Sequence, residues 1–404
     1  MKEFFCDKCK GNQKICQISF CPLLNKFKLF KPQTINEFEG SSPPDIFVGR
    51  VGYPNIYTGI LSPPETGEDT TKLSHPEEWF QQQLSVEEIL HTRTKLIYSR
   101  FKNEIRNPTN KLSVIMQEVA MTHKPVDVEF ILQKKPRESL ITSNITSPLA
   151  NVAPLRRARL TSNPRIHTKV DYFVNDPYVK AKDAIKELYK RDLTITNLNK
   201  MLSAGILGIK KQRKLVPSKW SITATDDMIS KEHITHIKRN HLINDITIHT
   251  SYYVGNLYII VLFPQYWSFE VIECKIPEMQ FWQDYESVFP RKWYADEVTG
   301  AYYANRLAVT EYLIRIKRQA AVLVLRQIDP SYTAPLGVGI LRENARNAFK
   351  KQAIHVKDNK ELNELLQTYL GISPHHFIKR SRLLNTRIEQ RTLSSFGKKE
   401  LSTG

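Results

Sequence analysis

The pattern of hydrophobic and polar positions along the chain alternates between stretches typical of strands and stretches typical of helices. Residues 41–67 read SSPPDIFVGRVGYPNIYTGILSPPETG, where Gly and Pro separate short β-branched and aromatic runs. Such a pattern predicts strands joined by tight turns. Gly49 and Gly52 flank Arg50 and would also suit a phosphate cradle, but no helix start follows them directly, which favours the turn.

Helical periodicity dominates the next stretch, from Ser85 to Met121. Ser85 and Glu88 have the spacing of a capping box, which marks a helix start. Leu96, Phe101 and Ile105 then recur at helix-like spacing. We therefore expect this stretch to be helical.

Further helices are expected on either side of a run of strands. Asp176 is a suitable N-cap, with Pro177 at the first helical position, for a helix over residues 176–188. Two more helical patterns cover residues 299–318 and 342–350. The predicted strands are residues 220–224, 246–253, 257–263, 269–276 and 321–328, with Val254-Gly255-Asn256 as a hairpin turn between two of them.

These elements predict an α+β fold without internal repeats. Residues 141–154 are rich in Ser, Asn and Pro and indicate a loop or domain junction. From about Ile378 onward the chain is basic and loses its periodicity, which is typical of a flexible tail. We therefore expect a Cys-rich unit at 1–32, an N-terminal α+β region at 33–150, a basic α+β core region at 151–377 and a tail at 378–404.

Composition narrows the range of partners. The 404 residues include 41% hydrophobic residues, enough for a sizeable core, and carry a formal net charge of +18. An excess of this size indicates a polyanionic partner, either nucleic acid or an anionic membrane surface. The longest apolar run, residues 257–263, is too short to cross a bilayer, and the N-terminus lacks the apolar core of a signal peptide. We expect a cytoplasmic protein with no membrane association.

The N-terminus contains a metal-binding pattern. Cys6, Cys9, Cys16 and Cys21 are spaced C-x2-C-x6-C-x4-C. One tight turn can aim the first pair at a metal, and two further thiolates complete the tetrahedron of a structural Zn²⁺ site. The alternatives are an iron–sulfur cluster, whose common spacings differ, and four unconnected cysteines. Because four cysteines leave no open coordination position, we expect the zinc to be structural; Cys274, alone in an apolar strand pattern, is expected to be a buried, inert thiol.

The tail contains a second motif, in the segment EQRTLSSFGKK. Gln390, Leu393 and Phe396 are spaced by three, so one 3₁₀ turn would present the Leu and the Phe as a single apolar plug beside the Gln amide. The spacing resembles the clamp-binding peptide of sliding-clamp partners, Gln-x-x-aliphatic-x-x-aromatic-aromatic. Gly397 stands where the second aromatic residue would be, which removes apolar area and weakens the expected affinity.

Several longer stretches resemble the archaeal Nre DNA-repair family (NreA and NreB). They are PPDIFVGRVGYPNIYTG, LSAGILG, KLVPSKWSITATDD, VTGAYYANRLAVTEYL, KRQAAVLVLRQI and APLGVGILRENAR. Together with the cysteine cluster and the tail motif they span nearly the whole chain. The resemblance implies a role in repairing damaged DNA and a partnership with the replication sliding clamp (PCNA) through the tail. It does not imply a particular catalytic chemistry.

Two basic clusters are candidates for contact with DNA phosphates. No acidic residue is among the members of either cluster. Contacts with phosphates need several Lys or Arg side chains on one face of the protein. The alternative is a pair of solvated loops. The clusters are Arg156, Arg157, Arg159, Arg165 and Lys169, and Lys210, Lys211, Arg213, Lys214 and Lys219.

A metal-dependent nuclease is the alternative function. Glu273 and Lys275 form an E-x-K pattern on a predicted strand, where both side chains point to one face, and Asp226 and Asp227 lie upstream. One Mg²⁺ held by Asp and Glu, with the Lys polarising water, would cut phosphodiesters. E-x-K is also common on half-exposed strands, where it usually faces solvent, so this pattern alone does not establish an enzyme.

The adjacent histidines His375 and His376 are expected to be surface residues, because adjacent side chains usually diverge. Two classes of function therefore remain. One is a non-enzymatic adaptor that binds DNA and the clamp, and the other is a clamp-tethered enzyme acting on damaged DNA.

Overall fold

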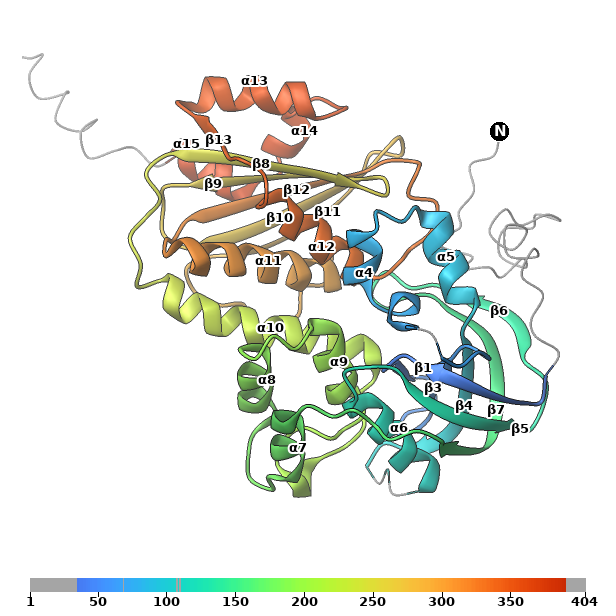
Figure 1. The fold of residues 1–404 in the computed structure, drawn as a ribbon. Helices are drawn as coiled ribbons and strands as arrows, with labels where there is room; N and C mark the ends of the chain where they lie inside the picture. The colour runs from blue at the N-terminus through green and yellow to red at the C-terminus, as the bar shows by residue number, and fades with distance from the viewer. Residues whose placement is uncertain (1–34, 68, 107, 109, 390–404) are drawn as a thin grey trace, which may run out of the picture. The chain divides into compact units, whose positions relative to one another are not determined.

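A computed structural model describes residues 35–67, 69–106, 108 and 110–389, which form two compact units (Figure 1). The first unit runs to Glu232 and includes Ser331–Glu343, whereas the second comprises His233–Pro330 and continues from Asn344. The chain passes between the units three times, twice inside the helices α10 (Ser218–Ile237) and α12 (Val338–Ala348) and once between Pro330 and Ser331. Both units combine helices with a sheet, so the predicted α+β class is confirmed. The cysteine unit predicted for residues 1–32 lies outside the described residues.

The first unit is built on a seven-stranded sheet in the order β1-β5-β7-β4-β3-β2, with β6 paired to β7. Neighbouring strands are antiparallel except β4 and β7. The strands are β1 (Glu37–Ser42), β2 (Ile46–Val48), β3 (Asn55–Ser62), β4 (Ile97–Glu104), β5 (Val126–Leu132), β6 (Arg137–Ile141) and β7 (Leu149–Leu160). The strands and turns predicted for residues 41–67 are confirmed. Gly52 has a φ of +83° in the β2–β3 turn, a conformation that glycine adopts readily.

The predicted helix from Ser85 to Met121 is only partly confirmed. Its capping box is present, because Ser85 and Glu88 each accept a hydrogen bond from the other's backbone N–H. The middle of the stretch, however, is strand β4, so the prediction of helix there is wrong. From Ser99 onward the buried side chains of β4 alternate as in a half-buried strand, but two of them, Ser99 and Asn103, are polar and conceal the alternation in the sequence.

Short helices complete the first unit. They are η1 (Thr71–Leu73), α4 (Pro76–Gln81), α5 (Val86–Thr94), α6 (Lys111–Met121), α7 (Thr168–Asn175), α8 (Ala181–Tyr189), α9 (Ile195–Ser203) and η2 (Lys210–Gln212), with the first part of α10. Asp176 does not cap the expected helix. It follows the end of α7, where its carboxylate accepts hydrogen bonds from the backbone of Tyr178 and Val179, and α8 begins only at Ala181.

Two more sequence predictions are corrected here. The strand predicted at residues 220–224 lies inside α10, where Ser221 is buried and Trp220 is exposed. The β-branched residues Ile222 and Thr223 favour a strand locally, but tertiary packing outweighs that preference. Of the loop or domain junction expected at residues 141–154, residues 142–148 do connect two strands, but residues 149–154 belong to β7, so the predicted domain limit at residue 150 falls within this strand.

The second unit contains a six-stranded sheet in the order β11-β10-β12-β9-β8-β13. Only the β10–β12 pair is parallel. The strands are β8 (Ile246–Tyr253), β9 (Asn256–Phe263), β10 (Ser268–Lys275), β11 (Gln280–Glu286), β12 (Ala321–Ile328) and β13 (Ile354–Val356). The predicted hairpin between β8 and β9 is confirmed. Val254 and Gly255 both have positive φ, as the two central residues of a type I′ turn require.

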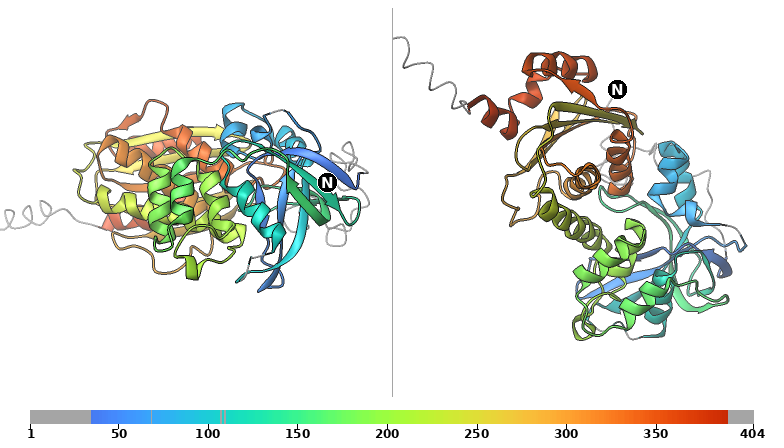
Figure 2. Two further views of the ribbon diagram at one scale, coloured as in Figure 1. Left: turned by 60° about the horizontal axis from the view of Figure 1, so that its bottom comes forward. Right: turned by 60° about the vertical axis from the view of Figure 1, so that its left-hand side comes forward.

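Helices cover both faces of this second sheet. Figure 1 shows α11 (Gly300–Ile316) on one face, and α13 (Asn359–Tyr369), α14 (His375–Ile378) and α15 (Arg382–Glu389) on the other, and Figure 2 shows the same arrangement from other directions. All eight residues of the central strand β12 are buried, as expected for a strand covered on both faces. Within the described residues, no helix has the length and apolar composition needed to span a membrane.

The start of the predicted flexible tail is also corrected, because residues 382–389 form helix α15. Its first turn is held by Glu270 of β10, a fully buried carboxylate. Glu270 accepts hydrogen bonds from the backbone N–H of Arg382 (2.8 Å) and Leu383 (3.1 Å) and from the Ser381 hydroxyl (2.6 Å). A carboxylate at a helix N-terminus is stabilising. Because this carboxylate comes from a distant strand, the hydrophobic periodicity of the tail alone did not predict the helix.

His249 makes the stability of the second unit depend on pH. Its ring is buried and packs against the rings of Tyr312 and Phe349, with centroids 5.1 and 4.8 Å away. Burial lowers the pKa of His249 to about 4. The unfolded chain therefore binds a proton more readily between about pH 6.5 and 4, and we expect acidification through this range to cost about 2–3 kcal/mol of stability.

A His249→Phe variant keeps an aromatic ring at this position and removes the group that must stay uncharged. In urea unfolding at pH 7 and pH 4.5, we expect the variant to lose less stability on acidification than the parent. His375→Gln, a change at an exposed histidine, serves as the control and should behave like the parent. An equal acid-induced loss in the parent and in His249→Phe would show that other groups cause the acid sensitivity.

Candidate functional site

Helix α9 of the first unit has an unusual polar stripe for a buried helix. Thr196, Asn199, Lys200 and Ser203 are spaced three or four residues apart and therefore share one face. All four are at most 8% exposed. Burying polar side chains costs free energy unless they find partners, so such a stripe needs either an internal network or a ligand.

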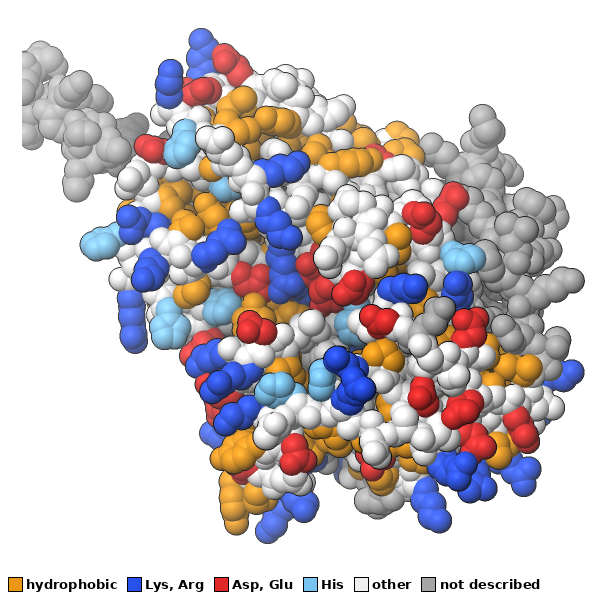
Figure 3. Space-filling model, in the orientation of Figure 1, with side chains coloured by type: hydrophobic (Ala, Val, Ile, Leu, Met, Phe, Trp, Pro, Cys, Tyr) orange, Lys and Arg blue, Asp and Glu red, His pale blue; other side chains and the backbone are white. Residues whose placement is uncertain are grey.

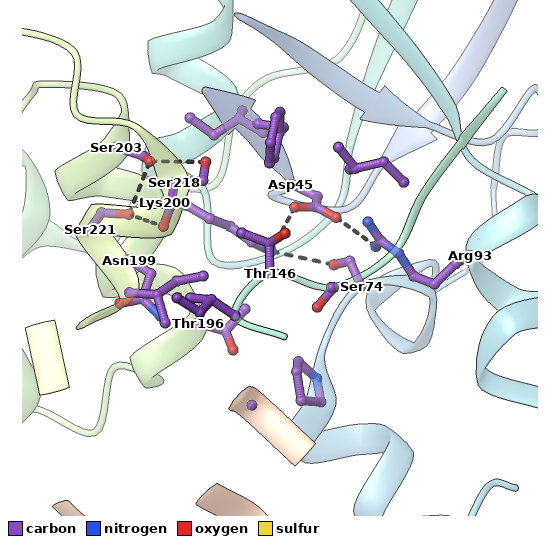
Figure 4. Close-up of a pocket in the computed structure, with 18 of the residues that line it drawn as sticks. Asp45, Ser74, Arg93, Thr146, Thr196, Asn199, Lys200, Ser203, Ser218 and Ser221 are labelled. Carbon is purple, nitrogen blue, oxygen red and sulfur yellow. Dashed lines mark hydrogen bonds and ion pairs between the residues drawn. The ribbon is translucent and has the colours of Figure 1, made fainter. Parts of the chain in front are cut away.

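The stripe lines a cavity of about 80 Å³ within the first unit (Figure 4). Other parts of the unit supply the opposite walls, namely the β2 edge with Asp45, the turn before α4 with Ser74, helix α5 with Arg93, and the starts of α10 and α12. The charged residues that line it are Asp45, Arg93, Lys200 and Arg342. Three cations and one carboxylate thus face the same small volume.

The carboxylate is shared unequally between two of these cations. Arg93 lies 2.8 Å from one oxygen of Asp45, whereas the Lys200 ammonium lies 3.5 Å from the other and 3.4 Å from the Ser74 hydroxyl. Arg93 is held further by the carbonyls of Leu73 and Pro148. Arg93 is therefore tightly fixed, while the contacts of Lys200 are longer than an ordinary hydrogen bond.

Burial and charge act in opposite directions on these groups. Burial raises the pKa of Asp45, but the charges of Lys200 and Arg93 outweigh it and hold the pKa below its usual value. Burial lowers the pKa of Lys200, against the opposing effect of Asp45. The pKa of His75 is also lowered, mainly by burial and secondly by the nearby charge of Lys200. The His75 ring lies 3.0 Å from the Ser74 hydroxyl.

Hydroxyl groups cluster where α9 lies beside the start of α10. The Ser203 hydroxyl lies 3.1 Å from that of Ser218 and 3.0 Å from that of Ser221, and Ser218 also accepts a hydrogen bond from the backbone of Val48. In contrast, the buried carboxamide oxygen of Asn199 has no hydrogen-bond partner among the described residues. The site therefore combines a self-satisfied serine network with one buried group that lacks a partner.

The first predicted basic cluster lies along β7 and the segment after it. Arg157 and Arg159 are exposed and two residues apart on one strand, so they project from the same face. Arg159 lies 3.2 Å from Glu129 on the neighbouring strand, in an exposed ion pair. Arg156, Arg165 and Lys169 are exposed as well.

The second basic cluster is only partly available for binding. Lys210, Lys211 and Lys214 are exposed on η2 and just after it. Arg213 is not equivalent to them, because its guanidinium donates hydrogen bonds to the carbonyls of Gly208, Val174, Phe173 and Asp176. Arg213 therefore ties the segment to the end of α7, while Lys219 lies half-buried in the first turn of α10.

The residues of the nuclease pattern each have a charged neighbour within their own unit. The ion pairs are Asp226 with Arg342 (2.8 Å), Asp227 with Lys231 (2.7 Å), Glu273 with Arg326 (2.8 Å) and Lys275 with Glu278 (3.1 Å). The two aspartates belong to the first unit, and Glu273 and Lys275 to the second. No group of three or more potential metal-ligating side chains occurs within the described ranges.

Three smaller sequence predictions concern single residues. Cys274 is buried, and burial raises the pKa of its thiol to about 11, which favours the unreactive protonated form. His375 and His376 are both exposed, as expected. The predicted zinc ligands Cys6, Cys9, Cys16 and Cys21 and the tail residues Gln390, Leu393 and Phe396 lie outside the described residues.

The cavity itself was not predicted from the sequence. Its charged residues Asp45, Arg93, Lys200 and Arg342 are widely separated along the chain, and none belongs to a recognisable short motif. The only local signal is the polar spacing on α9. Four of the stretches on which the Nre resemblance rests nevertheless contribute to its lining, through Asp45, Ser203, Ser218 and Arg342.

Comparison with known proteins covers almost the entire chain. A family model described as "Archaeal Nre, N-terminal" matches residues 15–282, and one described as "Archaeal Nre, C-terminal" matches residues 286–396. A protein named DNA repair protein NreB from Archaeoglobus fulgidus is 33% identical over 401 residues, which are 97% of this chain and 99% of that protein.

Two further relatives are named DNA repair protein NreA. The one from Haloferax volcanii is 33% identical over 349 residues, covering 83% of each chain. The one from Archaeoglobus fulgidus is 36% identical over 358 residues, covering 86% of this chain and 89% of the relative. No solved structure matches the chain.

Proposed function

Because the chain belongs to the archaeal Nre family, we propose that it is a DNA-repair protein that binds DNA and is recruited to the replication sliding clamp (PCNA) through residues 390–396. The observation that carries the proposal is the similarity to relatives named DNA repair proteins, which in one case extends over 97% of the chain. Similarity over this length argues for a shared role of the whole protein and not only for a shared domain.

Charge and exposure support direct binding to DNA. The net charge of +18 favours association with a polyanion, and the exposed residues Arg157, Arg159, Lys210, Lys211 and Lys214 are suited to phosphate contacts. Figure 3 shows basic and acidic side chains interspersed on the face that it presents. Binding is therefore expected to depend on local clusters and not on one uniformly basic surface.

We expect charge reversal of Lys210, Lys211 and Lys214 to glutamate to weaken binding to duplex DNA. Each lost phosphate contact should also flatten the plot of log affinity against log salt by roughly 0.9. Fluorescence anisotropy with a labelled duplex at several salt concentrations measures both effects. Arg213 is left unchanged, since its replacement would disturb the backbone that it holds.

The matched control reverses Lys350, Lys351 and Lys357, three exposed lysines of the second unit, and changes the net charge by the same amount. It should reduce affinity less than the first variant. If both variants lose the same affinity, overall charge and not the predicted cluster governs binding. A salt-independent affinity in the parent protein would contradict the electrostatic proposal as a whole.

Recruitment to the clamp is supported by the position of the tail motif. Helix α15 (Arg382–Glu389) is held to the second sheet by Glu270, and Gln390 is the next residue in the sequence. A clamp-binding motif in this position would connect the clamp to the folded second unit with no intervening domain.

We also propose that Cys6, Cys9, Cys16 and Cys21 hold one structural zinc ion. Elemental analysis of purified protein is expected to give one zinc per chain, and a Cys6→Ala/Cys9→Ala variant should lose it. The N-terminal segment should then lose structure, since so small a unit has little core of its own, while the rest of the chain stays folded. Equal zinc contents in the two proteins would rule out this ligand set, and the single change Cys274→Ala is the control.

A further inference from the structure

We propose that the cavity of the first unit is a binding site for the phosphate group of a small ligand, with Lys200 as its principal charged contact. The inference goes beyond the proposed function, because it requires neither duplex binding nor the clamp. It rests on the composition of the cavity, on the incomplete pairing of Lys200 and on the buried amide of Asn199.

The size of the cavity suits a phosphate group. A volume of about 80 Å³ has room for about five water-sized groups, which is close to the size of one phosphorus with its four oxygens. Because the cavity is partly open to solvent, the remainder of a phosphomonoester can extend outward from it.

The charges that line the cavity favour an anion. Arg93 and Asp45 form a close pair at 2.8 Å, and Arg342 is paired at 2.8 Å with Asp226. Lys200 is different, since its ammonium approaches Asp45 only to 3.5 Å. An ammonium group has three protons to donate, so Lys200 keeps donor capacity for a ligand in the cavity. Asp45 is then a positioning residue that keeps Lys200 directed toward the space.

The uncharged lining matches the acceptor-rich surface of a phosphate. Asn199 is buried on the same helical face as Lys200, and its carboxamide has an unpartnered oxygen. The two ends of a carboxamide are interchangeable by rotation, so the NH₂ group can be turned to donate into the cavity. The hydroxyls of Ser203, Ser218 and Ser221 can likewise reorient, and such side chains commonly contact phosphates.

A metal ion is a poorer fit for the same space. Hard cations require several carboxylate or carbonyl oxygens, and Asp45 is the only carboxylate of the lining and already faces two cations. An uncharged ligand would leave Lys200 without a better partner than Asp45. A phosphate group is therefore the chemistry that best completes the site.

Titration calorimetry of the full chain tests this inference. The probes are inorganic phosphate, deoxyadenosine 5′-monophosphate and deoxyadenosine, which lacks the phosphate. We expect saturable binding of one phosphate-bearing probe per chain and no binding of deoxyadenosine. If deoxyadenosine 5′-monophosphate binds and inorganic phosphate does not, the site recognises a phosphomonoester. If the two bind with equal affinity, the site recognises the phosphate group alone. Either result supports the proposed site.

Two variants place the binding in the cavity. Lys200→Met should weaken it at least about tenfold, the usual effect of losing a charged hydrogen bond. Asn199→Asp is nearly the same size and adds a negative charge, so it should also block binding even if Lys200→Met folds poorly. Lys190→Met, a change at the exposed lysine that follows α8, should bind like the parent. Charge reversal of Lys210, Lys211 and Lys214 should leave this binding intact, which separates it from DNA binding.

Three results would overturn the inference. The first is that none of the probes binds to the parent protein. The second is that Asn199→Asp binds the phosphate probes as tightly as the parent does. The third is that deoxyadenosine binds as tightly as its monophosphate, because the phosphate would then contribute nothing to recognition.

Discussion

Replacing Arg306 with methionine is expected to lower the free energy of unfolding of the second unit by about 3–5 kcal/mol. Arg306 on α11 and Glu286 at the end of β11 form an ion pair at 2.8 Å, and both side chains are only 1% exposed. Trp267 donates a further hydrogen bond to Glu286. Without the guanidinium, Glu286 would remain as a buried charge that has lost its paired cation.

The double variant Glu286→Gln/Arg306→Met distinguishes the two possible sources of this loss. Removing both charges should recover part of the stability, since the large cost comes from the isolated charge and not from the missing attraction. Lys190→Met, which removes an exposed ion pair with Glu187, should leave stability almost unchanged. Urea unfolding followed by tryptophan fluorescence measures all three variants. If Arg306→Met lowers the free energy of unfolding by less than about 1 kcal/mol, the claim that an isolated Glu286 charge strongly destabilises the core is contradicted.

Phe396→Ala is expected to remove most of the affinity for the sliding clamp, and Gly397→Phe to increase it. Burial of a Phe side chain contributes about 1.5–3 kcal/mol, which corresponds to roughly a tenfold to hundredfold change in affinity. Ordering a short segment on the clamp costs a comparable amount, so the parent peptide should bind with only micromolar affinity. A second aromatic residue at position 397 would bury further apolar area and so increase the net free energy of binding.

Titration calorimetry with the clamp of the same organism measures these changes, first with tail peptides and then with full-length protein. Leu401→Ala, outside the motif, is the control and should have no effect. Deletion of residues 390–404 removes the motif and leaves residues Arg382–Glu389 of α15 in place. Unchanged clamp binding after that deletion would place the contact elsewhere in the chain.

The second unit was predicted more accurately from the sequence than the first. Strands β8 and β12 have the predicted limits, because their strand-forming residues are followed by clear turn residues, Val254-Gly255 and Asp329-Pro330. In the first unit, buried polar side chains obscure the periodicity. Ser99 conceals strand β4, and Ser221 and Thr225 occupy buried positions on α10 where apolar residues are normally expected.

The candidate sites show the same limit of local patterns. Sequence reasoning grouped Arg213 with its basic neighbours, although its guanidinium is occupied by backbone carbonyls. Apart from the polar spacing on α9, the sequence did not indicate Lys200, because Asp45, the partner that defines its environment, lies more than 150 residues away. Charge content is evident from the sequence, but the availability of a charge for binding depends on tertiary contacts.

Survival of the host organism after DNA damage tests the central claim most directly. The gene for this chain would be deleted, and survival after ultraviolet light and after a DNA-crosslinking agent would be compared with that of the parent strain. The proposed role predicts greater sensitivity of the deletion strain to at least one agent, restored by the full chain but not by the chain lacking residues 390–404. Equal survival of the deletion and parent strains over the whole dose range, for both agents, would contradict a role in DNA repair.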